Sequence, residues 1–526
     1  MTNSYNELAD SKCILAIGSN TPEAHPIIGL RIHKAVENGA RLIVANPREI
    51  DLVRWAHLWL RQKPGSNVAL LMGMAKVIID EDLVDHKFIQ DRCENYDALL
   101  ASLKGFSLET AQAETGVDKD QIVQAARIYA TEKPGAILYA MGITQYSHGT
   151  DNVLATANLA LLTGNLGKPG SGINPLRGQN NVQGACDMGA LPTVYSGYQS
   201  VEDPAARAKF EAAWGVPLPP KSGLTLTEMI TAIYEGKIKA LYVIGENPVL
   251  SEPDIKHVKE ALAKLELLVV QDIFLTETAA LAHIVLAAAS FAEKDGTFTN
   301  TERRVQRIRQ AIAPIGNSRP DWWITAQLAR RMGGKGFDYN SPTDIMAEIN
   351  HLTTSYGGIT WDRLEKEGLQ WPCPTPQHPG TPILHTEKFT RGKGKFIPVT
   401  YQPPAETPDK DYPLILTTGR SLYQYHTGTM TRKVAGLNLL KREEEVEINP
   451  ADAARLNIND GDMVRVTSRR GEVTARARVT AVSPEGVVFM TFHFAESPAN
   501  MLTNTAFDPV SRIPELKACA VRVERA

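Results

Sequence analysis

The stretch Cys13-Ile-Leu-Ala-Ile-Gly-Ser-Asn20 is a run of apolar residues that ends in a turn of small residues. Apolar positions at helical spacing follow over residues 25–38, and Gly39 suits the C-terminal cap of such a helix. A second apolar run, Arg41-Leu-Ile-Val-Ala45, stops at Asn46-Pro47. This order predicts a strand, a helix and a second strand parallel to the first, joined by a right-handed crossover.

The same order of elements returns in the middle of the chain. Ala240-Leu-Tyr-Val-Ile244 predicts a strand, and Gly245-Glu-Asn-Pro248 is its turn. Residues 254–265 predict a helix, and Leu267-Leu-Val-Val270 predicts a second strand that Gln271-Asp272 stops. The chain therefore contains an internal repeat of two βαβ units of the kind that binds nucleotides.

The turns of the two copies suggest where ligands bind. In open α/β sheets, ligands bind beyond the carboxyl ends of the strands, where free backbone N–H groups at a helix N-terminus attract anions. Two copies imply two nucleotide-like ligands, or one ligand with two such ends. Neither copy contains Gly-x-Gly-x-x-Gly, so an ordinary NAD site is not indicated. The alternative is that each Gly-x-Asn only forms a tight turn.

Length and composition limit the class of protein. A chain of 526 residues is long enough for three or four domains, and its 22% of charged residues is typical of a globular protein. A net charge of −3 argues against a strongly basic nucleic-acid binder. No apolar run is long enough for a membrane-spanning helix. The 5 cysteines include no Cys-x-x-Cys pair, which argues against disulfides, a zinc site or a self-contained iron–sulfur cluster and favours the cytoplasm.

The C-terminal part differs in character from the rest. Short strands are predicted at 412–418 and 446–449, and a hairpin with a glycine turn at 461–479. Strands at this spacing suggest a small β-barrel. We therefore predict an α/β multi-domain fold with two related βαβ domains and a C-terminal β-barrel. Its expected division is 1–179 and 180–295 for the two dinucleotide-binding domains, 296–398 for a loop-rich connection, and 399–526 for the barrel.

One segment is unusually rich in glycine and amides: Gly164-Asn-Leu-Gly-Lys-Pro-Gly-Ser-Gly-Ile-Asn-Pro-Leu-Arg-Gly-Gln-Asn-Asn-Val-Gln-Gly-Ala-Cys-Asp-Met-Gly189. Such a composition favours close backbone approach and dense hydrogen bonding around a polar ligand. The segment closely resembles the molybdopterin-dependent formate dehydrogenases. Gly245-Glu-Asn-Pro248, Gln271-Asp-Ile-Phe274, Thr299-Asn-Thr-Glu-Arg-Arg304 and Thr418-Gly-Arg-Ser421 also resemble that family, and the resemblance covers essentially the whole chain.

The resemblance implies a cofactor that explains the repeat. The family binds two molybdopterin guanine dinucleotides around one molybdenum or tungsten atom, and it oxidises formate to carbon dioxide or catalyses the reverse reaction. The expected residues for one dinucleotide are Gly18, Ser19, Asn20, Glu23, Asn46, Arg48, Gly65 and Asn67, and for the other Gly245, Asn247, Gln271, Asp272, Thr276 and Asp321. Those expected near the pterins are Met141, Gly142, Gln145 and Gln179. Those expected to close over the cofactor are Arg420, Ser421, Gln424, Tyr425, Asn500 and Lys517.

Arg177 is the expected catalytic residue. A guanidinium is a planar, permanently charged fork of donors that matches a carboxylate such as formate. In the family this arginine orients formate beside the metal. The alternatives are a contact with a cofactor phosphate and a surface ion pair. Cys186 is not expected to bind the metal, and His25 is expected to be a structural or cofactor hydrogen-bond partner.

The sequence departs from the family pattern in one respect. The family carries cysteines for a [4Fe–4S] cluster and then a cysteine or selenocysteine that binds the metal, and neither is present here. Our hypothesis is that a selenocysteine codon was taken for a stop; the alternative is that the segment is a separate chain or is lost. We expect no turnover from this chain alone, and exposed apolar surface where the missing segment would pack.

The expected partners are formate or carbon dioxide and electron-transfer subunits with iron–sulfur clusters, without nucleic acid and without a membrane span. Two alternative functions remain. The chain could be a non-catalytic scaffold of a respiratory dehydrogenase, although a scaffold has no need of Arg177 and both dinucleotide turns. It could also be a nitrate reductase, which belongs to the same wider family.

Overall fold

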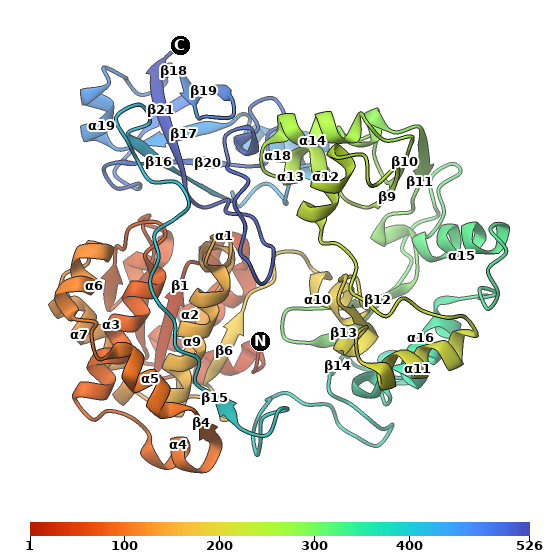
Figure 1. Cartoon of the computed structure of the whole chain (residues 1–526), viewed down its shortest axis with the longest axis horizontal. Coiled ribbons are helices and arrows are strands. Elements are labelled where there is room, and N and C mark those ends of the chain that lie inside the picture. Colours follow the sequence, from red (N-terminus) through yellow and green to blue (C-terminus); the bar gives the residue numbers. More distant parts are fainter. The chain divides into compact units, whose positions relative to one another are not determined.

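The computed structural model describes residues 1–526, which form two compact units. The first unit contains residues 1–178, 250–256 and 383–526, and the second contains 179–249 and 257–382. The N-terminal α/β region and the C-terminal barrel therefore belong to one unit (Figure 1). The finer division into four domains stays a prediction.

The predicted first βαβ unit is confirmed. Strands β1 (Cys13–Ile17) and β2 (Arg41–Ala45) are parallel and in register, with Cys13 opposite Arg41. The helix predicted over residues 25–38 is α2 (Pro26–Glu37), and a short helix that was not predicted, α1 (Thr21–Ala24), precedes it after an interruption. The interruption falls at His25, whose φ of −145° and ψ of 63° are not helical. The reason is local, because a residue before proline is pushed out of the helical region.

The sheet of the first unit has five parallel strands in the order β3-β2-β1-β5-β6. One face packs on α2, where Ile28 and Ile32 lie against Ile14 and Val44. The other face packs on α3, α7 and α9 in the largest core cluster. Bounds of the further elements are β3 Leu58–Leu60, α3 Asn67–Asp80, α4 His86–Arg92, α5 Tyr96–Leu103, α6 Leu108–Thr115, α7 Lys119–Thr131, β5 Gly135–Tyr139, α8 Met141–Thr144, α9 Gly149–Thr163 and β6 Gly172–Pro175.

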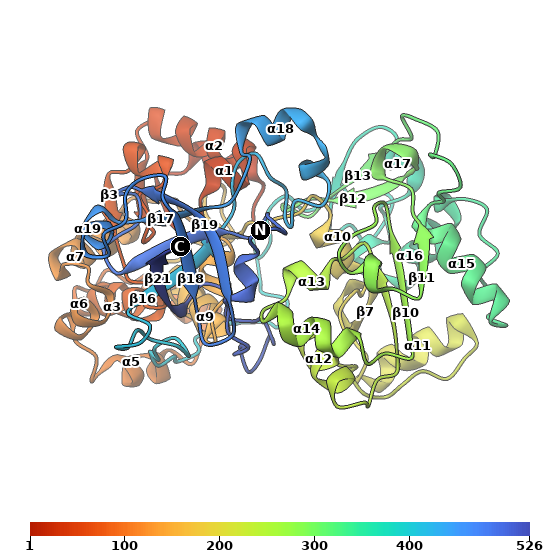
Figure 2. The same cartoon turned by 90° about the horizontal axis from the view of Figure 1, so that it is seen from above.

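The predicted C-terminal barrel is also confirmed. Six strands close in the order β16-β20-β17-β19-β18-β21, with an apolar interior (Figure 2). The predicted hairpin is the antiparallel pair β18 and β19. The bounds are β16 Leu414–Gly419, α18 Ala435–Leu440, β17 Glu445–Ile448, α19 Pro450–Arg455, β18 Met463–Thr467, β19 Glu472–Val479, β20 Val487–Thr491 and β21 Cys519–Arg525.

The second unit contains the second copy of the repeat. Strands β9 (Ala240–Ile244), β10 (Leu267–Asp272) and β11 (Ile284–Ala287) are parallel. Strand β10 runs on through Gln271-Asp272, so the predicted end at Val270 was wrong by two residues. In Figures 1 and 2, α12 (Leu226–Tyr234) and α14 (Ile255–Leu262) lie on one side of this sheet.

The repeat extends one strand further than predicted. In each copy a short 3-10 helix follows the second strand, η2 (Asp51–Trp55) or η4 (Ala279–Leu281), and leads to a third parallel strand, β3 or β11. Burial differs between the copies, because Ile284 on β11 is 47% exposed whereas the equivalent Leu58 on β3 is 8% exposed. The second sheet therefore exposes apolar surface that the first sheet buries.

The remaining elements of the second unit are short, with bounds α10 Val182–Asp187, β7 Val194–Tyr195, β8 Gln199–Ser200, α11 Pro204–Trp214, β12 Gly296–Thr299, β13 Arg304–Ile308, α15 Asp321–Arg331, α16 Pro342–Leu352, α17 Trp361–Leu364 and β14 Leu369–Gln370. Two minor strands, β4 (Cys93–Glu94) and β15 (Gly394–Lys395), pair in the first unit. Helix α13 covers Pro248–Ser251. None of the helices combines the length and the apolar character needed to cross a bilayer.

Candidate functional site

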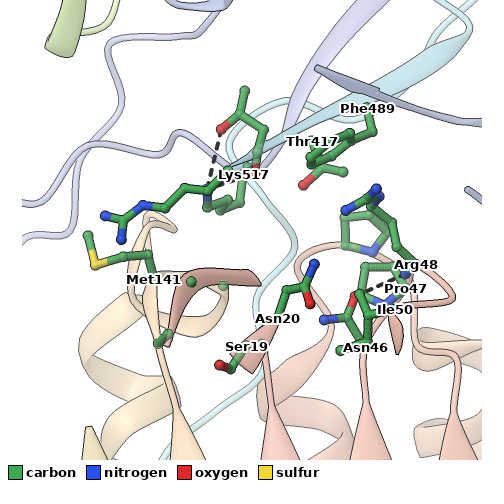
Figure 3. Close-up of a pocket in the computed structure, with 18 of the residues that line it drawn as sticks. Ser19, Asn20, Asn46, Pro47, Arg48, Ile50, Met141, Thr417, Phe489 and Lys517 are labelled. Atoms are coloured by element: carbon green, nitrogen blue, oxygen red, sulfur yellow. Dashed lines mark hydrogen bonds between the residues drawn. The ribbon is translucent and has the colours of Figure 1, made fainter. Parts of the chain in front are cut away.

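A pocket in the first unit lies where the strands of the sheet end. Its walls come from the turns after β1, β2, β3 and β5 and from the barrel strands β16 and β20. In Figure 3, Asn20, Asn46 and Arg48 follow the ends of the sheet strands, and Lys517 and Phe489 of the barrel face them. This position agrees with the general rule for ligands of parallel sheets.

Two glycines bring the turns after β1 and β5 together. Gly18 has a φ of 57°, and its carbonyl accepts a hydrogen bond from Gly142 N at 3.0 Å. A Cβ atom on Gly142 would lie 2.3 Å from Gly18 O, so no larger residue fits without movement. The two turns can therefore present adjacent backbone groups to a ligand.

Lys517 places a buried charge at the pocket. Its side chain is 7% exposed, and Nζ donates to Thr418 O at 2.7 Å but forms no ion pair with a carboxylate. Burial, and to a smaller extent the charge of the nearby Arg420, lowers the pKa of Lys517 to about 7. Arg420 is half-buried and likewise has no carboxylate partner, and burial lowers its pKa. Positive groups held in this way are suited to an anionic ligand.

Three histidines near Arg420 stay neutral. Burial, together with the charge of Arg420, lowers the pKa values of His25, His426 and His493 to about 4. The ring of His493 accepts a hydrogen bond from Ser421 N through Nε2 at 2.9 Å and donates through Nδ1 to His426 O. This arrangement requires a neutral ring with its proton on Nδ1.

Several acceptors in the pocket wall lack partners. Asn20 Oδ1, Gln62 Oε1 and His25 Nδ1 are buried and form no hydrogen bond. Buried polar atoms are nearly always satisfied, so these atoms indicate a ligand with donor groups. Together with the glycine turns and the buried cations, they fit a group that carries both phosphates and a heterocycle, as a dinucleotide does.

Arg48 joins the pocket wall to the barrel. Its guanidinium donates to both carboxylate oxygens of Glu447 on β17 and lies 3.5 Å from the centroid of the Phe489 ring. Arg48 therefore presents a neutralised pair to the pocket rather than a free positive charge.

The structure brings together about half of the residues predicted for the site. Those that line the pocket are Gly18, Ser19, Asn20, Glu23, Asn46, Arg48, Asn67, Met141, Gly142, Arg420 and Lys517. Ser421 lines an adjoining cavity, together with Arg420 and Arg48. The pocket wall does not include Gly65, Gln145, Gln179, Gln424, Tyr425, Asn500 or Arg177.

Three of the residues outside the wall have partners within the protein. Gly65 packs against Pro404, and a Cβ there would lie 2.2 Å from the proline ring. Gln424 Oε1 accepts from Thr431, and its amide donates to Lys441 O. The amide of Asn500 donates to Leu250 O at 2.8 Å. Their direct cofactor contacts stay predictions.

The turn of the second copy has the geometry of the first. Gly245 has a φ of 63° and donates to Gln271 O at 2.9 Å, as Gly18 donates to Ala45 O at 3.0 Å. The side chains around it are bonded to one another, since Asn247 accepts from Thr278 Oγ1 at 2.7 Å. The other predicted residues also have internal bonds: Gln271 to Asp321, Asp272 to Ile273 N, and Thr276 to Ala279 N.

Sequence reasoning missed part of the wall. Pro47, Ile50, Gln62, Lys63, Tyr146, Thr417, Thr418 and Phe489 line the pocket but were not predicted. Gln62 and Lys63 follow β3, so extending the repeat to its third strand would have found them. Phe489 and Thr417 have no such signal, because their role depends on how the barrel packs on the sheet.

Arg177 lies beside this pocket. The preceding residue Leu176 lines the wall, and the carbonyl of Arg177 is 2.7 Å from His25 Nε2. A Cβ on the following Gly178 would lie 2.3 Å from Arg420 Nη1. The backbone of the predicted substrate arginine is thus bonded to His25 of the pocket wall, and the next residue lies against Arg420.

Comparisons with known proteins agree with this geometry. The family model "Molybdopterin oxidoreductase" matches residues 1–331, and "Molydopterin dinucleotide binding domain" matches residues 414–520. The chain is 53% identical to F420-dependent formate dehydrogenase subunit alpha of Methanocaldococcus jannaschii, over 100% of this chain and 78% of the relative. It is 40% identical to formate dehydrogenase H of Escherichia coli, over 100% of this chain and 74% of the relative.

Two further comparisons bear on fold and on the alternatives. Acetylene hydratase from Pelobacter acetylenicus has a similar fold, with a TM-score of 0.78 and 21% identity over 99% of this chain and 78% of that one. The assimilatory nitrate reductase catalytic subunit of Bacillus subtilis is 38% identical over 99% of this chain and 76% of the relative. Identity is therefore higher with the two formate dehydrogenases than with the nitrate reductase.

Proposed function

Because the chain belongs to the molybdopterin oxidoreductase family, we propose that it is the catalytic subunit of a formate dehydrogenase. It oxidises formate to carbon dioxide, or catalyses the reverse, at a molybdenum or tungsten centre that carries two molybdopterin guanine dinucleotides. The observation that supports this most is the 53% identity with a formate dehydrogenase alpha subunit over the whole chain. Nitrate reduction is the weaker alternative, with 38% identity to the nitrate reductase.

The first dinucleotide binds in the pocket of the first unit. Its phosphates lie by the turn of Gly18 and by Lys517, where free N–H groups and a buried ammonium attract anions. Asn20, Gln62 and His25 supply acceptors for its N–H groups. The second dinucleotide binds beyond β9 and β10, where the turn of Gly245 repeats the geometry of Gly18.

Arg177 binds the substrate. The guanidinium donates two parallel hydrogen bonds to the carboxylate of formate and fixes the direction of its C–H bond. The bound metal centre supplies the acceptor for the two electrons that leave when this bond breaks. The products are carbon dioxide and a proton, so charge and atoms balance.

The electrons then pass to other subunits. The name of the archaeal relative, a subunit alpha, implies that it works with further chains. We propose electron-transfer subunits with iron–sulfur clusters as partners, and the cytoplasm as the compartment. The four-domain division of the chain, with a barrel over the cofactor, belongs to the same proposal.

The test uses the enzyme that contains this chain, purified from a host that makes the cofactor. Formate should reduce an artificial electron acceptor, and nitrate should not oxidise a reduced one. Arg177→Gln keeps a polar side chain but shortens it and removes the charged fork, so we expect a loss of at least 100-fold in kcat/KM with unchanged guanine nucleotide content. Nitrate turnover without formate turnover would overturn the proposal, and a folded protein without nucleotide would favour a scaffold.

A further inference from the structure

We propose that His25 is a positioning residue for Arg177. The hydrogen bond between them links the wall of the dinucleotide pocket to the substrate arginine. This inference rests on the proposed function, because it assigns a role in formate binding. It concerns a histidine that comes from the first βαβ unit, whereas Arg177 follows strand β6. The two residues are 152 positions apart and meet through one hydrogen bond.

The backbone of His25 is held firmly. The residue lies between α1 and α2, its N–H donates to Thr21 O at 2.8 Å, and its carbonyl accepts from Gly29 N at 3.0 Å. The following Pro26 restricts its conformation further. The imidazole therefore projects from a fixed point at the edge of the pocket.

The direction of the hydrogen bond follows from chemistry. A carbonyl oxygen only accepts, so Nε2 of His25 carries the proton and donates to Arg177 O at 2.7 Å. Burial lowers the pKa of His25 to about 4, so the ring is neutral and its only proton is the one on Nε2. Nδ1 therefore carries no proton and can only accept a hydrogen bond. It is one of the buried atoms of the pocket wall that form no hydrogen bond. One ring thus faces Arg177 with its donor and the pocket with its acceptor.

The neighbours of Arg177 are also fixed. Leu176 N donates to Tyr139 O at 2.8 Å, which ties the chain to the end of β5. Gly178 lies directly against the guanidinium of Arg420, which would have to move to admit a Cβ. His25 holds the peptide group between these two points. Rotation of that peptide would swing the Arg177 side chain, so the hydrogen bond sets the direction of the guanidinium.

Small displacements matter for this substrate. Formate offers two oxygen atoms and no other polar group, so its orientation depends on the two bonds of the guanidinium fork. A misplacement on the order of 1 Å can cost a large factor in rate or binding. Loss of the His25 bond should therefore raise KM for formate while the cofactor stays bound.

Two substitutions separate the two ends of the ring. His25→Gln places an amide N–H near the position of Nε2 and can still donate to Arg177 O. His25→Asn ends near the position of Nδ1, so it keeps a polar atom toward the pocket but does not reach Arg177. His86→Asn is the matched control, because His86 is exposed and pairs with Asp82 at the surface.

The experiment compares the three variants in the loaded enzyme. We expect His25→Asn to raise KM for formate about tenfold with a smaller change in kcat, and His25→Gln to return it to within about threefold of the wild type. The concentration of formate that gives half-maximal protection against heat should shift in parallel, which provides a readout that needs no turnover. Guanine nucleotide and metal content should match that of the His86→Asn control.

Two results would overturn the inference. Equal KM values for both His25 variants would mean that the donor to Arg177 does not matter. Loss of nucleotide from His25→Asn in proportion to its loss of activity would mean that His25 acts on formate turnover through the cofactor and not through Arg177. Failure of the proposed function is distinct, since the wild-type enzyme would then hold its cofactor and still show neither turnover of formate nor protection by it.

Discussion

Arg48 and Glu447 form a two-point ion pair between the sheet and the barrel. Arg48 follows β2 and Glu447 lies on β17, 399 residues later, yet the guanidinium reaches both carboxylate oxygens, at 3.0 and 2.7 Å. Both side chains are largely buried, with exposed fractions of 13% and 8%. Arg48 lines the pocket and both residues line the adjoining cavity, so the stability of the barrel contact and the shape of the site depend on the same pair.

Removing one partner of this pair should be costly. We predict that Arg48→Ala lowers the free energy of unfolding by about 3 kcal/mol, because it leaves the Glu447 carboxylate buried without its partner. Arg478→Ala is the matched control, since Arg478 is 4.0 Å from the same carboxylate and 53% exposed, and should cost less than about 1 kcal/mol. Chemical unfolding of both variants measures the difference, and equal losses would contradict the role of Arg48.

The close approach of Gly18 and Gly142 leads to a second prediction, which concerns stability and nucleotide content. In Gly142→Ala the new Cβ meets Gly18 O, so the two turns must separate. We expect a loss of stability of about 1–3 kcal/mol and of most of the bound guanine nucleotide. Gly105→Ala is the control, because nothing lies within 4 Å of its Cβ position. Nucleotide retained at the wild-type level in Gly142→Ala would show that the turn does not form part of the site.

The lowered pKa of Lys517 leads us to predict that the stability of the cofactor-free protein depends on pH. Its folded-state pKa of about 7 lies below the ordinary value of 10.5, so between these pH values the unfolded chain holds a proton that the folded chain lacks. The free energy of unfolding should therefore rise with pH in this window, with a slope that approaches about 1.4 kcal/mol per pH unit. Lys517→Met should remove that slope.

The measurement is chemical unfolding of cofactor-free wild type and Lys517→Met at pH 7, 8 and 9. The difference between the two proteins isolates this group from other titrating residues. Lys104→Met provides the control, because Lys104 is exposed and should leave the slope unchanged. Parallel curves for wild type and Lys517→Met would mean that the buried ammonium keeps its charge throughout.

The buried His493 leads us to predict that the folded protein loses stability in acid. Burial lowers its pKa to about 4, below the ordinary value of 6.5, so its stabilising effect is present above pH 6.5 and is lost as pH falls toward 4. This group alone can account for about 3 kcal/mol over that range. His493→Asn can still donate to His426 O but does not titrate. Unfolding measured between pH 6.5 and 4.5 should show a shallower loss for the variant, and identical slopes would contradict the prediction.

The local sequence pattern was sufficient for the framework of the fold. The two βαβ units, the glycine turns and the barrel hairpin each follow from residues that are close in sequence, as β1 and β9 illustrate. The pattern did not reveal the short helix α1 that precedes the predicted helix α2. His25 lies between the two helices with a non-helical backbone, and its ring is bonded to the carbonyl of Arg177.

The site was predicted less completely, for a physical reason. Turn residues such as Asn20 and Asn46 lie at strand ends, so topology alone places them in the pocket. Phe489 depends on a contact between distant segments, with Arg48, which no spacing within the sequence reveals. Gln424 was predicted as a cofactor ligand; its amide is bonded to Thr431 and Lys441, and its contact with the cofactor stays a prediction.

The most direct test of cofactor binding by the two βαβ units is to measure guanine nucleotide and metal in this protein, purified from a host that makes the cofactor. Two related turns, at Gly18 and Gly245, predict two guanine nucleotides per chain, released on denaturation, together with molybdenum or tungsten in the active enzyme. One nucleotide per chain would contradict the equivalence of the two copies. A well-folded protein with no nucleotide would contradict the central claim that the repeat is a binding site for the dinucleotide cofactor.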